Sequence, residues 1–207
     1  MRDGTTALKS ISLISYTGFE FIELNLISET SPLEVVLDEI FKCIAAGLVY
    51  PALHLALSVP DVCSSLETAH DEDARFRIQR RYVAWCETYL SQEFLVFTAS
   101  DCWALRGGVL HNGMFASHPG SQYDRILFTL PNPRMTLHEN ISRNNGGIIE
   151  SALQLDAKLF CEAMATAARR WYLLKKDDPK VVQNLPNLVR VRPNGVSPHI
   201  VGVPLIA

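Results

Sequence analysis

The feature that most constrains the fold is an amphipathic segment late in the chain, residues 157–174. Its apolar side chains recur at helical spacing and form one stripe: Phe160, Met164, Ala167, Trp171 and Leu174. Asp156 stands directly before the stripe, where a carboxylate can accept hydrogen bonds from the first free N–H groups of a helix. Because such a helix is stable mainly through packing of its stripe, the sequence predicts a helical core.

The first half of the chain repeats this periodicity. Ser31-Pro32 is a helix-start signal, and Gly47 is the expected stop of the first helix. We expect a short second helix over 49–57 and a further turn from Pro60-Asp61 through Leu66. A longer helix then carries one apolar face: Ile78, Tyr82, Trp85, Cys86 and Tyr89. Residues 32–113 are therefore predicted to form a helical bundle.

The second half of the chain changes character. Residues 125–130 and 135–141 flank Pro131-Asn132-Pro133-Arg134, which predicts a β-hairpin, and residues 148–155 supply a candidate third strand. The tail from residue 177, rich in proline and β-branched residues, is expected to be extended. The predicted fold class is mainly α (α+β): a helical bundle, a small antiparallel β-sheet and a C-terminal helix.

Length and composition indicate one globular domain over residues 31–207. The chain has 207 residues, 48% of them hydrophobic, which is enough for one sizeable core. Residues 1–30 lack a clear period and are predicted to be a variable N-terminal arm. The uncharged stretch 43–60 is shorter than the ~20 residues that a bilayer requires, so no membrane association is predicted.

Charge and cysteine content narrow the functional classes. The net charge of −3 gives no general attraction to nucleic acid or to an anionic membrane. Five widely spaced cysteines lie within apolar helical patterns, which is typical of reduced thiols in a cytoplasmic protein: Cys43, Cys63, Cys86, Cys102 and Cys161. A phosphate-binding loop, a serine-hydrolase elbow and a dinucleotide-binding fingerprint are all missing from the sequence, and no cofactor or metal is predicted.

Residues 100–113 are the most informative segment for function. Apolar side chains surround the axis of the predicted helix Asp101–His111, which is capped by Thr98 or Ser100 and ends at Asn112-Gly113, so this helix is expected to be buried. A guanidinium on such a helix must be paired. The candidate partners of Arg106 are Asp61 and Glu67, and His111 can interact with the helix C-terminus.

This segment resembles the HEPN superfamily, whose ribonuclease members carry an arginine and, after a short spacer, a histidine near the end of a late helix. Arg106 and His111 match that pattern with four intervening residues, while Gly107 stands where those members often have a polar residue. The resemblance implies a metal-independent endoribonuclease or toxin, often with two protomers at the site. His111 would act as acid or base on the ribose 2′-hydroxyl, and Arg106 would stabilise the phosphorane-like charge.

A second resemblance covers more of the chain. Pro60-Asp61-Val62-Cys63, Arg81-Tyr82-Val83-Ala84-Trp85 and the Arg106–His111 helix together resemble a family of small bacterial proteins, which implies no particular activity. Two functions therefore stay open. One is a non-catalytic binding or accessory component, with a protein partner or a second copy of the chain and with Arg106 as the centre of an ion pair. The alternative is the HEPN-like ribonuclease, for which RNA is the partner.

Other polar residues are weaker candidates. An arginine run interleaved with aromatic residues can follow a phosphate backbone or form a solvated helix face: Arg75, Phe76, Arg77, Arg80, Arg81 and Tyr82. His70, Asp71 and Asp73 can bind a metal or form an ordinary polar loop. The remaining histidines show no metal-ligand spacing to one another: His54, His118, His138 and His199.

Overall fold

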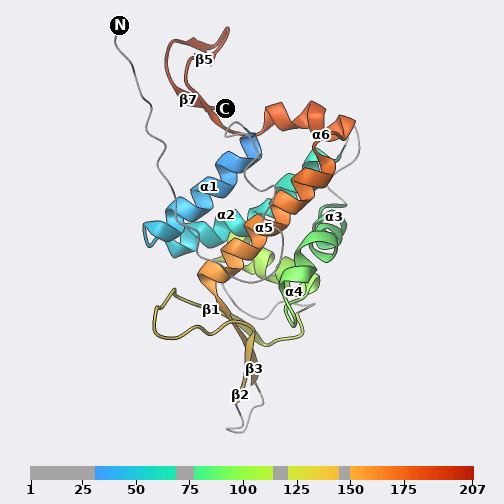
Figure 1. Ribbon diagram of the computed structural model, residues 1–207, viewed down its shortest axis with the longest axis vertical. Helices are drawn as coiled ribbons and strands as arrows, with labels where there is room; N and C mark the ends of the chain where they lie inside the picture. The colour runs from blue at the N-terminus through green and yellow to red at the C-terminus, as the bar shows by residue number, and fades with distance from the viewer. Residues whose placement is uncertain (1–30, 69–76, 114–120, 145–149) are drawn as a thin grey trace, which may run out of the picture.

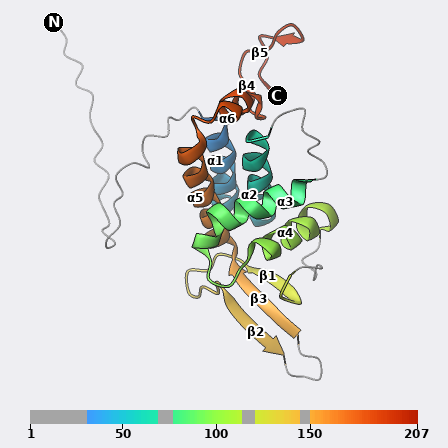
Figure 2. The same ribbon diagram turned by 90° about the vertical axis from the view of Figure 1, so that its right-hand side faces the viewer.

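The computed structural model describes residues 31–68, 77–113, 121–144 and 150–207 (Figure 1). The predicted arm, residues 1–30, lies outside this part of the chain. The predicted fold class is confirmed: helices dominate, and a small sheet lies at one end of them (Figure 2). The α-helices are α1 (Pro32–Ala45), α2 (Val49–Leu66), α3 (Ile78–Trp85), α4 (Ala99–Gly107), α5 (Ala157–Lys175) and α6 (Pro179–Asn184). Within the described ranges, every helix is too short or too polar to cross a lipid bilayer.

Helix α2 is the centre of the bundle and corrects one prediction. It packs against α1, α3, α4 and α5, and it runs through Pro60 as one helix, so the expectation of two short helices was wrong. Proline removes a backbone donor and commonly ends a helix. Here Leu57, Val59 and Cys63 on either side of it are fully buried, and their packing favours a continuous helix over the local preference of proline.

Helices α3 and α4 each end in a π-helical turn. Cys86–Leu90 (η3) follows α3 and leads into the 3₁₀ turn Ser91–Glu93 (η4), while Gly108–Asn112 (η5) follows α4. Thr98 caps α4: its hydroxyl accepts from the backbone N–H of Asp101, and the Asp101 carboxylate accepts from the N–H of Thr98. Gly113, in the left-handed region at φ 64°, ends the second π-turn.

The sheet is built differently from the predicted hairpin. Its strands are β1 (Arg125–Thr129), β2 (Asn140–Asn144) and β3 (Glu150–Asp156), in the order β1-β3-β2. β3 pairs with β1 in parallel, with Ile126 opposite Leu153, and with β2 in antiparallel, with Ile141 opposite Leu153. The expected pairing of 125–130 with 135–141 was therefore wrong.

Contacts of Glu139 account for the pairing of β2 with β3. Its φ of 54° turns the chain just before β2. Its carboxylate accepts hydrogen bonds from the backbone N–H groups of Leu95, Val96 and Phe97, with Oε1 at 2.7, 2.7 and 3.3 Å. This contact fastens the segment before β2 to the loop that precedes α4, and β2 pairs with β3 rather than with β1.

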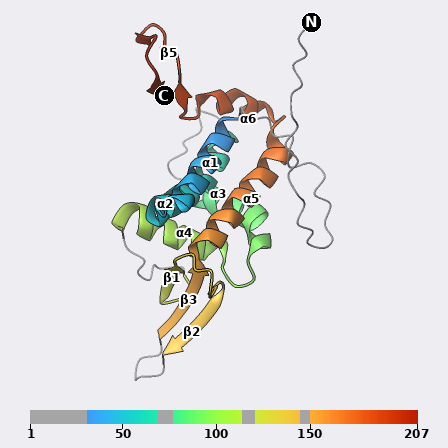
Figure 3. The same cartoon turned by 60° about the vertical axis from the view of Figure 1, so that its left-hand side comes forward.

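Strand β3 runs directly into α5, and the predicted N-cap is confirmed because Asp156 accepts from the N–H groups of Lys158 and Leu159 (Figure 2). The stripe is buried as predicted from Phe160 to Trp171, whereas Leu174 is 70% exposed. The predicted extended tail is partly helical: α6 and the 3₁₀ turn Leu185–Asn187 (η6) precede four short strands. These are β4 (Val191–Arg192), β5 (Gly195–Val196), β6 (Ile200–Val201) and β7 (Leu205–Ile206), and they lie at the end of the bundle opposite the sheet (Figure 3).

Candidate functional site

The π-turn η5 brings Arg106 and His111 together. In a regular α-helix, residues five positions apart point in directions that differ by about 140°. A π-turn closes its hydrogen bonds between residues five apart, so η5 brings His111 closer to the side of the helix on which Arg106, in the last turn of α4, lies. The Nη1 atom of Arg106 is accordingly 2.9 Å from Nε2 of His111. The two residues that carry the HEPN resemblance are thus in direct contact within one chain.

Arg106 is also held by a carboxylate and an aromatic ring. Its Nε and Nη2 atoms both lie 2.9 Å from Oδ2 of Asp61 on α2, and its guanidinium carbon lies 4.9 Å from the ring centre of Trp103. The side chains of Arg106 and Asp61 are 16% and 26% exposed. All three guanidinium nitrogens are therefore engaged, at a site that is largely shielded from water.

The protonation of this cluster follows from its geometry. Burial raises the pKa of the Asp61 carboxyl, and the charge and hydrogen bond of Arg106, with the charge of Arg81, act in the opposite direction. Arginine can only donate hydrogen bonds, so Nε2 of His111 must accept and a neutral ring carries its proton on Nδ1. The His111 side chain is exposed, whereas Arg106 and Asp61 are half-buried.

Glu67, the other predicted partner of Arg106, lies in a different cluster. Its Oε1 accepts from the indole Nε1 of Trp171 at 2.7 Å, and its Oε2 is 2.7 Å from Nζ of Lys175. The structure thus brings together Arg106, His111 and Asp61 and places Glu67 between α2 and α5.

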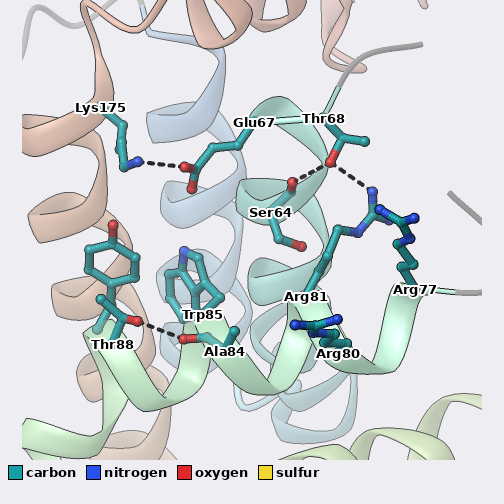
Figure 4. A pocket seen from close by; sticks show the side chains of 11 residues that line it. Ser64, Glu67, Thr68, Arg77, Arg80, Arg81, Ala84, Trp85, Thr88 and Lys175 are labelled. Atoms are coloured by element: carbon teal, nitrogen blue, oxygen red, sulfur yellow. Dashed lines mark hydrogen bonds and ion pairs between the residues drawn. The ribbon is translucent and has the colours of Figure 1, made fainter. Parts of the chain in front are cut away.

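Glu67 instead borders a cavity of about 590 Å³ between the C-terminal end of α2, the α3–η3 helix and the last turn of α5 (Figure 4). The residues that line it are Ser64, Glu67, Thr68, Arg77, Arg80, Arg81, Ala84, Trp85, Thr88, Tyr89 and Lys175. Four of them are basic and one is acidic, although the whole chain has a net charge of −3. Neither Arg106 nor His111 is among them.

Part of this cavity is visible in the sequence and part is not. The arginine run pointed to Arg77, Arg80 and Arg81 as a basic face of a helix. No pattern in the sequence associates them with Glu67 or Lys175, which come from other helices and meet α3 only through the tertiary fold. Arg75 and Phe76 lie outside the described residues.

The remaining candidates have structural contacts or cannot be placed. His54 Nδ1 lies 2.9 Å from the carbonyl oxygen of Tyr50, and His138 Nδ1 accepts from the N–H of Asp156. His199 donates its backbone N–H to Val196 in the β5–β6 ribbon. His70, Asp71, Asp73 and His118 lie outside the described residues. Across the described ranges, no group of three or more His, Cys, Asp or Glu side chains is arranged to hold a metal ion.

The cysteines are free thiols, and four of the five are buried, with Cys43 half-buried. Burial raises the pKa of Cys161 to about 12 and also raises the pKa values of Cys63 and Cys86. Cys102 lies 3.4 Å from the hydroxyl of Tyr82. Since the thiolate is the reactive form of cysteine, these three raised pKa values disfavour a nucleophilic role.

Comparisons of this chain with protein-family models, with curated proteins and with solved structures give no match.

Proposed function

We propose that the protein is a non-catalytic binding component, in which the Arg106 cluster stabilises the fold and the cavity between α2, α3 and α5 receives the ligand. The observation that carries this proposal is the engagement of Arg106. Asp61 holds two of its guanidinium nitrogens, and His111 is within hydrogen-bond distance of the third. An arginine that stabilises a phosphorane directs its donors at the phosphate, whereas three of the five N–H donors of Arg106 are directed at Asp61 and His111.

Asp61 adds an electrostatic reason. An RNA phosphate beside Arg106 would lie close to the Asp61 carboxylate, which lies 2.9 Å from the guanidinium and repels a second anion. To reach Arg106, the phosphate would have to displace a partly buried ion pair. The ion pair is thus better suited to joining α2 to α4 than to binding a substrate.

The alternative function is the HEPN-like, metal-independent endoribonuclease with Arg106 and His111 as its catalytic residues. One specific observation favours it: the two side chains are in contact at 2.9 Å, and the exposed imidazole of His111 is open to solvent. In that case His111 would act as acid or base on the 2′-hydroxyl, and Arg106 would leave Asp61 to bind the phosphate.

A paired measurement separates the two functions. The wild type, Arg106→Ala and His111→Ala are compared in urea unfolding and in cleavage of single-stranded RNA in EDTA. We expect intact RNA with the wild type over a broad pH range and a marked loss of stability in Arg106→Ala. A wild type that cleaves RNA, together with two folded and inactive variants, would establish the ribonuclease instead.

Asp61→Asn is the matched control. It removes the charge of the ion pair and leaves both residues of the Arg106–His111 contact in place. If Arg106 is structural, this variant should lose stability and gain no ribonuclease activity. If Arg106 is catalytic, release of the guanidinium from Asp61 should change the rate of cleavage.

A further inference from the structure

The cavity carries a second, more specific inference, which rests on the proposed binding function. We infer that it binds a small phosphorylated molecule whose remaining part is aromatic or apolar. The charges, the unpaired donors and the size of the cavity lead to this class of ligand.

The charges favour a phosphate. Within the described residues, neither Arg77 nor Arg80 has an ion-pair partner, and both are exposed. Arg81 donates from Nη1 to the hydroxyl of Thr68 at 2.7 Å and, within the described residues, has no carboxylate in ion-pair contact, although its charge acts on the more distant Asp61. Among the described residues that line the cavity, Lys175 alone has an ion-pair partner, which is Glu67. Three guanidinium groups are therefore not balanced by an acid among the described lining residues, and guanidinium matches phosphate in both charge and geometry.

Two of the three arginines extend toward the same end of the cavity. Arg80 and Arg81 lie in the first turn of α3, and Arg77 is the residue directly before this helix. In Figure 4, Arg81 reaches across the cavity to Thr68 at the end of α2, and Arg77 extends toward the same end. The carbonyl groups of Leu66 and Thr68 accept from the Asn184 side chain at 3.0 Å, so the negative end of α2 is already capped.

Two buried donors on the cavity wall lack partners within the described part of the chain. One is Nε1 of Trp85, whose residue is 3% exposed, and the other is Nε of Arg81. Figure 4 shows the indole nitrogen of Trp85 directed toward the Glu67–Lys175 pair. A buried N–H without an acceptor costs about 1–3 kcal/mol, which a ligand oxygen can recover.

The size and the far wall favour a ligand larger than a bare phosphate ion. A volume of about 590 Å³ lies within the range of small-molecule sites, and inorganic phosphate would fill a small part of it. Ala84, Trp85 and Tyr89 continue the cavity wall beyond the arginines and provide apolar and aromatic surface. In a phosphate ester with a ring, the phosphate can contact the arginines and the ring can contact the apolar and aromatic wall.

The test compares phosphorylated probes with their uncharged parents. Adenosine 5′-monophosphate and phenyl phosphate are titrated against the full chain by calorimetry, beside adenosine, phenol and inorganic phosphate. We expect saturable binding of at least one ester, at least tenfold weaker binding of its parent, and weakening of the ester's affinity by salt. Failure of both esters to bind would overturn the inference.

Matched variants locate the site. Arg77→Gln/Arg80→Gln changes two exposed arginines of the cavity and should weaken binding at least tenfold. Arg134→Gln/Arg143→Gln changes two exposed arginines near the sheet and should leave the affinity unchanged. Equal weakening by both pairs would indicate unspecific attraction to positive charge and would overturn the inference.

The outcome also distinguishes this inference from the proposed function. If adenosine or phenol binds as tightly as its ester, and Trp85→Phe weakens that binding, the cavity binds ligands but not phosphates, and only the inference fails. If RNA is cleaved in EDTA by the wild type, the proposed non-catalytic function fails, whatever the affinity of the cavity.

Discussion

Arginine occurs in two settings in this protein, and the difference between them defines its two candidate sites. At the end of α4, Arg106 is paired with Asp61, lies over Trp103 and contacts His111. At the start of α3, Arg77 and Arg80 are exposed and, among the described residues, have no carboxylate partner. The comparison teaches that the neighbours supplied by the fold decide whether a guanidinium stabilises the chain or stays available to a ligand.

The largest expected effect concerns the packing beneath the cavity. Trp171 is fully buried, and its indole donates to Glu67. We expect Trp171→Ala to lower the free energy of unfolding by about 3–5 kcal/mol, the range for emptying a large aromatic site. Urea unfolding measures it. Leu174→Ala, at a 70% exposed position of the same helix, is the control and should cost less than about 0.5 kcal/mol. Equal losses in the two variants would contradict the assignment of Trp171 to the core.

The second prediction tests the comparison directly. Arg106→Ala leaves the partly buried Asp61 without its partner, and we expect a loss of about 2–3 kcal/mol in the free energy of unfolding. Arg80→Ala should change it by less than about 0.5 kcal/mol, because that side chain is exposed and unpaired within the described residues. If the two alanine variants unfold alike, the distinction between a structural and an available arginine is wrong.

The third prediction concerns pH. The pKa of Asp61 is raised in the fold, mainly by burial, and Arg106 opposes that rise. Removal of Arg106 should raise it further. A carboxyl with a raised pKa favours the folded state most below its unfolded pKa of about 3.9, and that stability is lost as pH rises through the folded pKa.

Arg106→Ala should therefore be less destabilising in acid than at pH 7. Unfolding of the wild type and the variant between about pH 4 and pH 7 measures this difference. The control is the pair Asp61→Asn and Asp61→Asn/Arg106→Ala, whose difference should vary less with pH. A cost of Arg106→Ala that is constant across this range would show that Asp61 is not the group that responds.

The smallest expected effect is that of His111→Ala. The side chain is exposed, and its contact with Arg106 is one hydrogen bond, so we expect a loss below about 1 kcal/mol. The measurement is the same urea unfolding. A loss as large as that of Arg106→Ala would show that the imidazole, and not only Asp61, holds Arg106 in place.

The sequence predicts the elements that depend on local pattern. The start of α1, the cap of α5 and the stripe from Phe160 to Trp171 follow from spacing and capping residues, and the structure confirms them. The prediction fails where distant contacts override local preference. Helix α2 continues through Pro60 because its surroundings are packed, and β1 pairs with β3 although residues 131–134 after it predict a hairpin turn.

Of the two candidate sites, one could be predicted from local sequence pattern and the other depends on distant contacts. Arg106 and His111 are recognisable because they lie in one short motif, and Asp61 could be named as a partner because a buried arginine requires a carboxylate. The cavity could not be predicted, because Glu67, Trp85 and Lys175 come from three separate helices. The spacing of these three residues in the sequence does not indicate that they lie close together in the fold.

The π-turn after α4 allows Arg106 and His111 to lie in contact although the four residues between them are one more than a regular α-helix would require. In a regular helix the neighbour of Arg106 on the same side would be residue 110, one position before His111. The wider turn accommodates the extra residue, at a place where Gly107 and Gly108 have no side chains to crowd it. In a variant with Gly107 or Gly108 deleted, the histidine would follow the arginine by four positions, and a regular α-helix would bring the two side chains into the same contact.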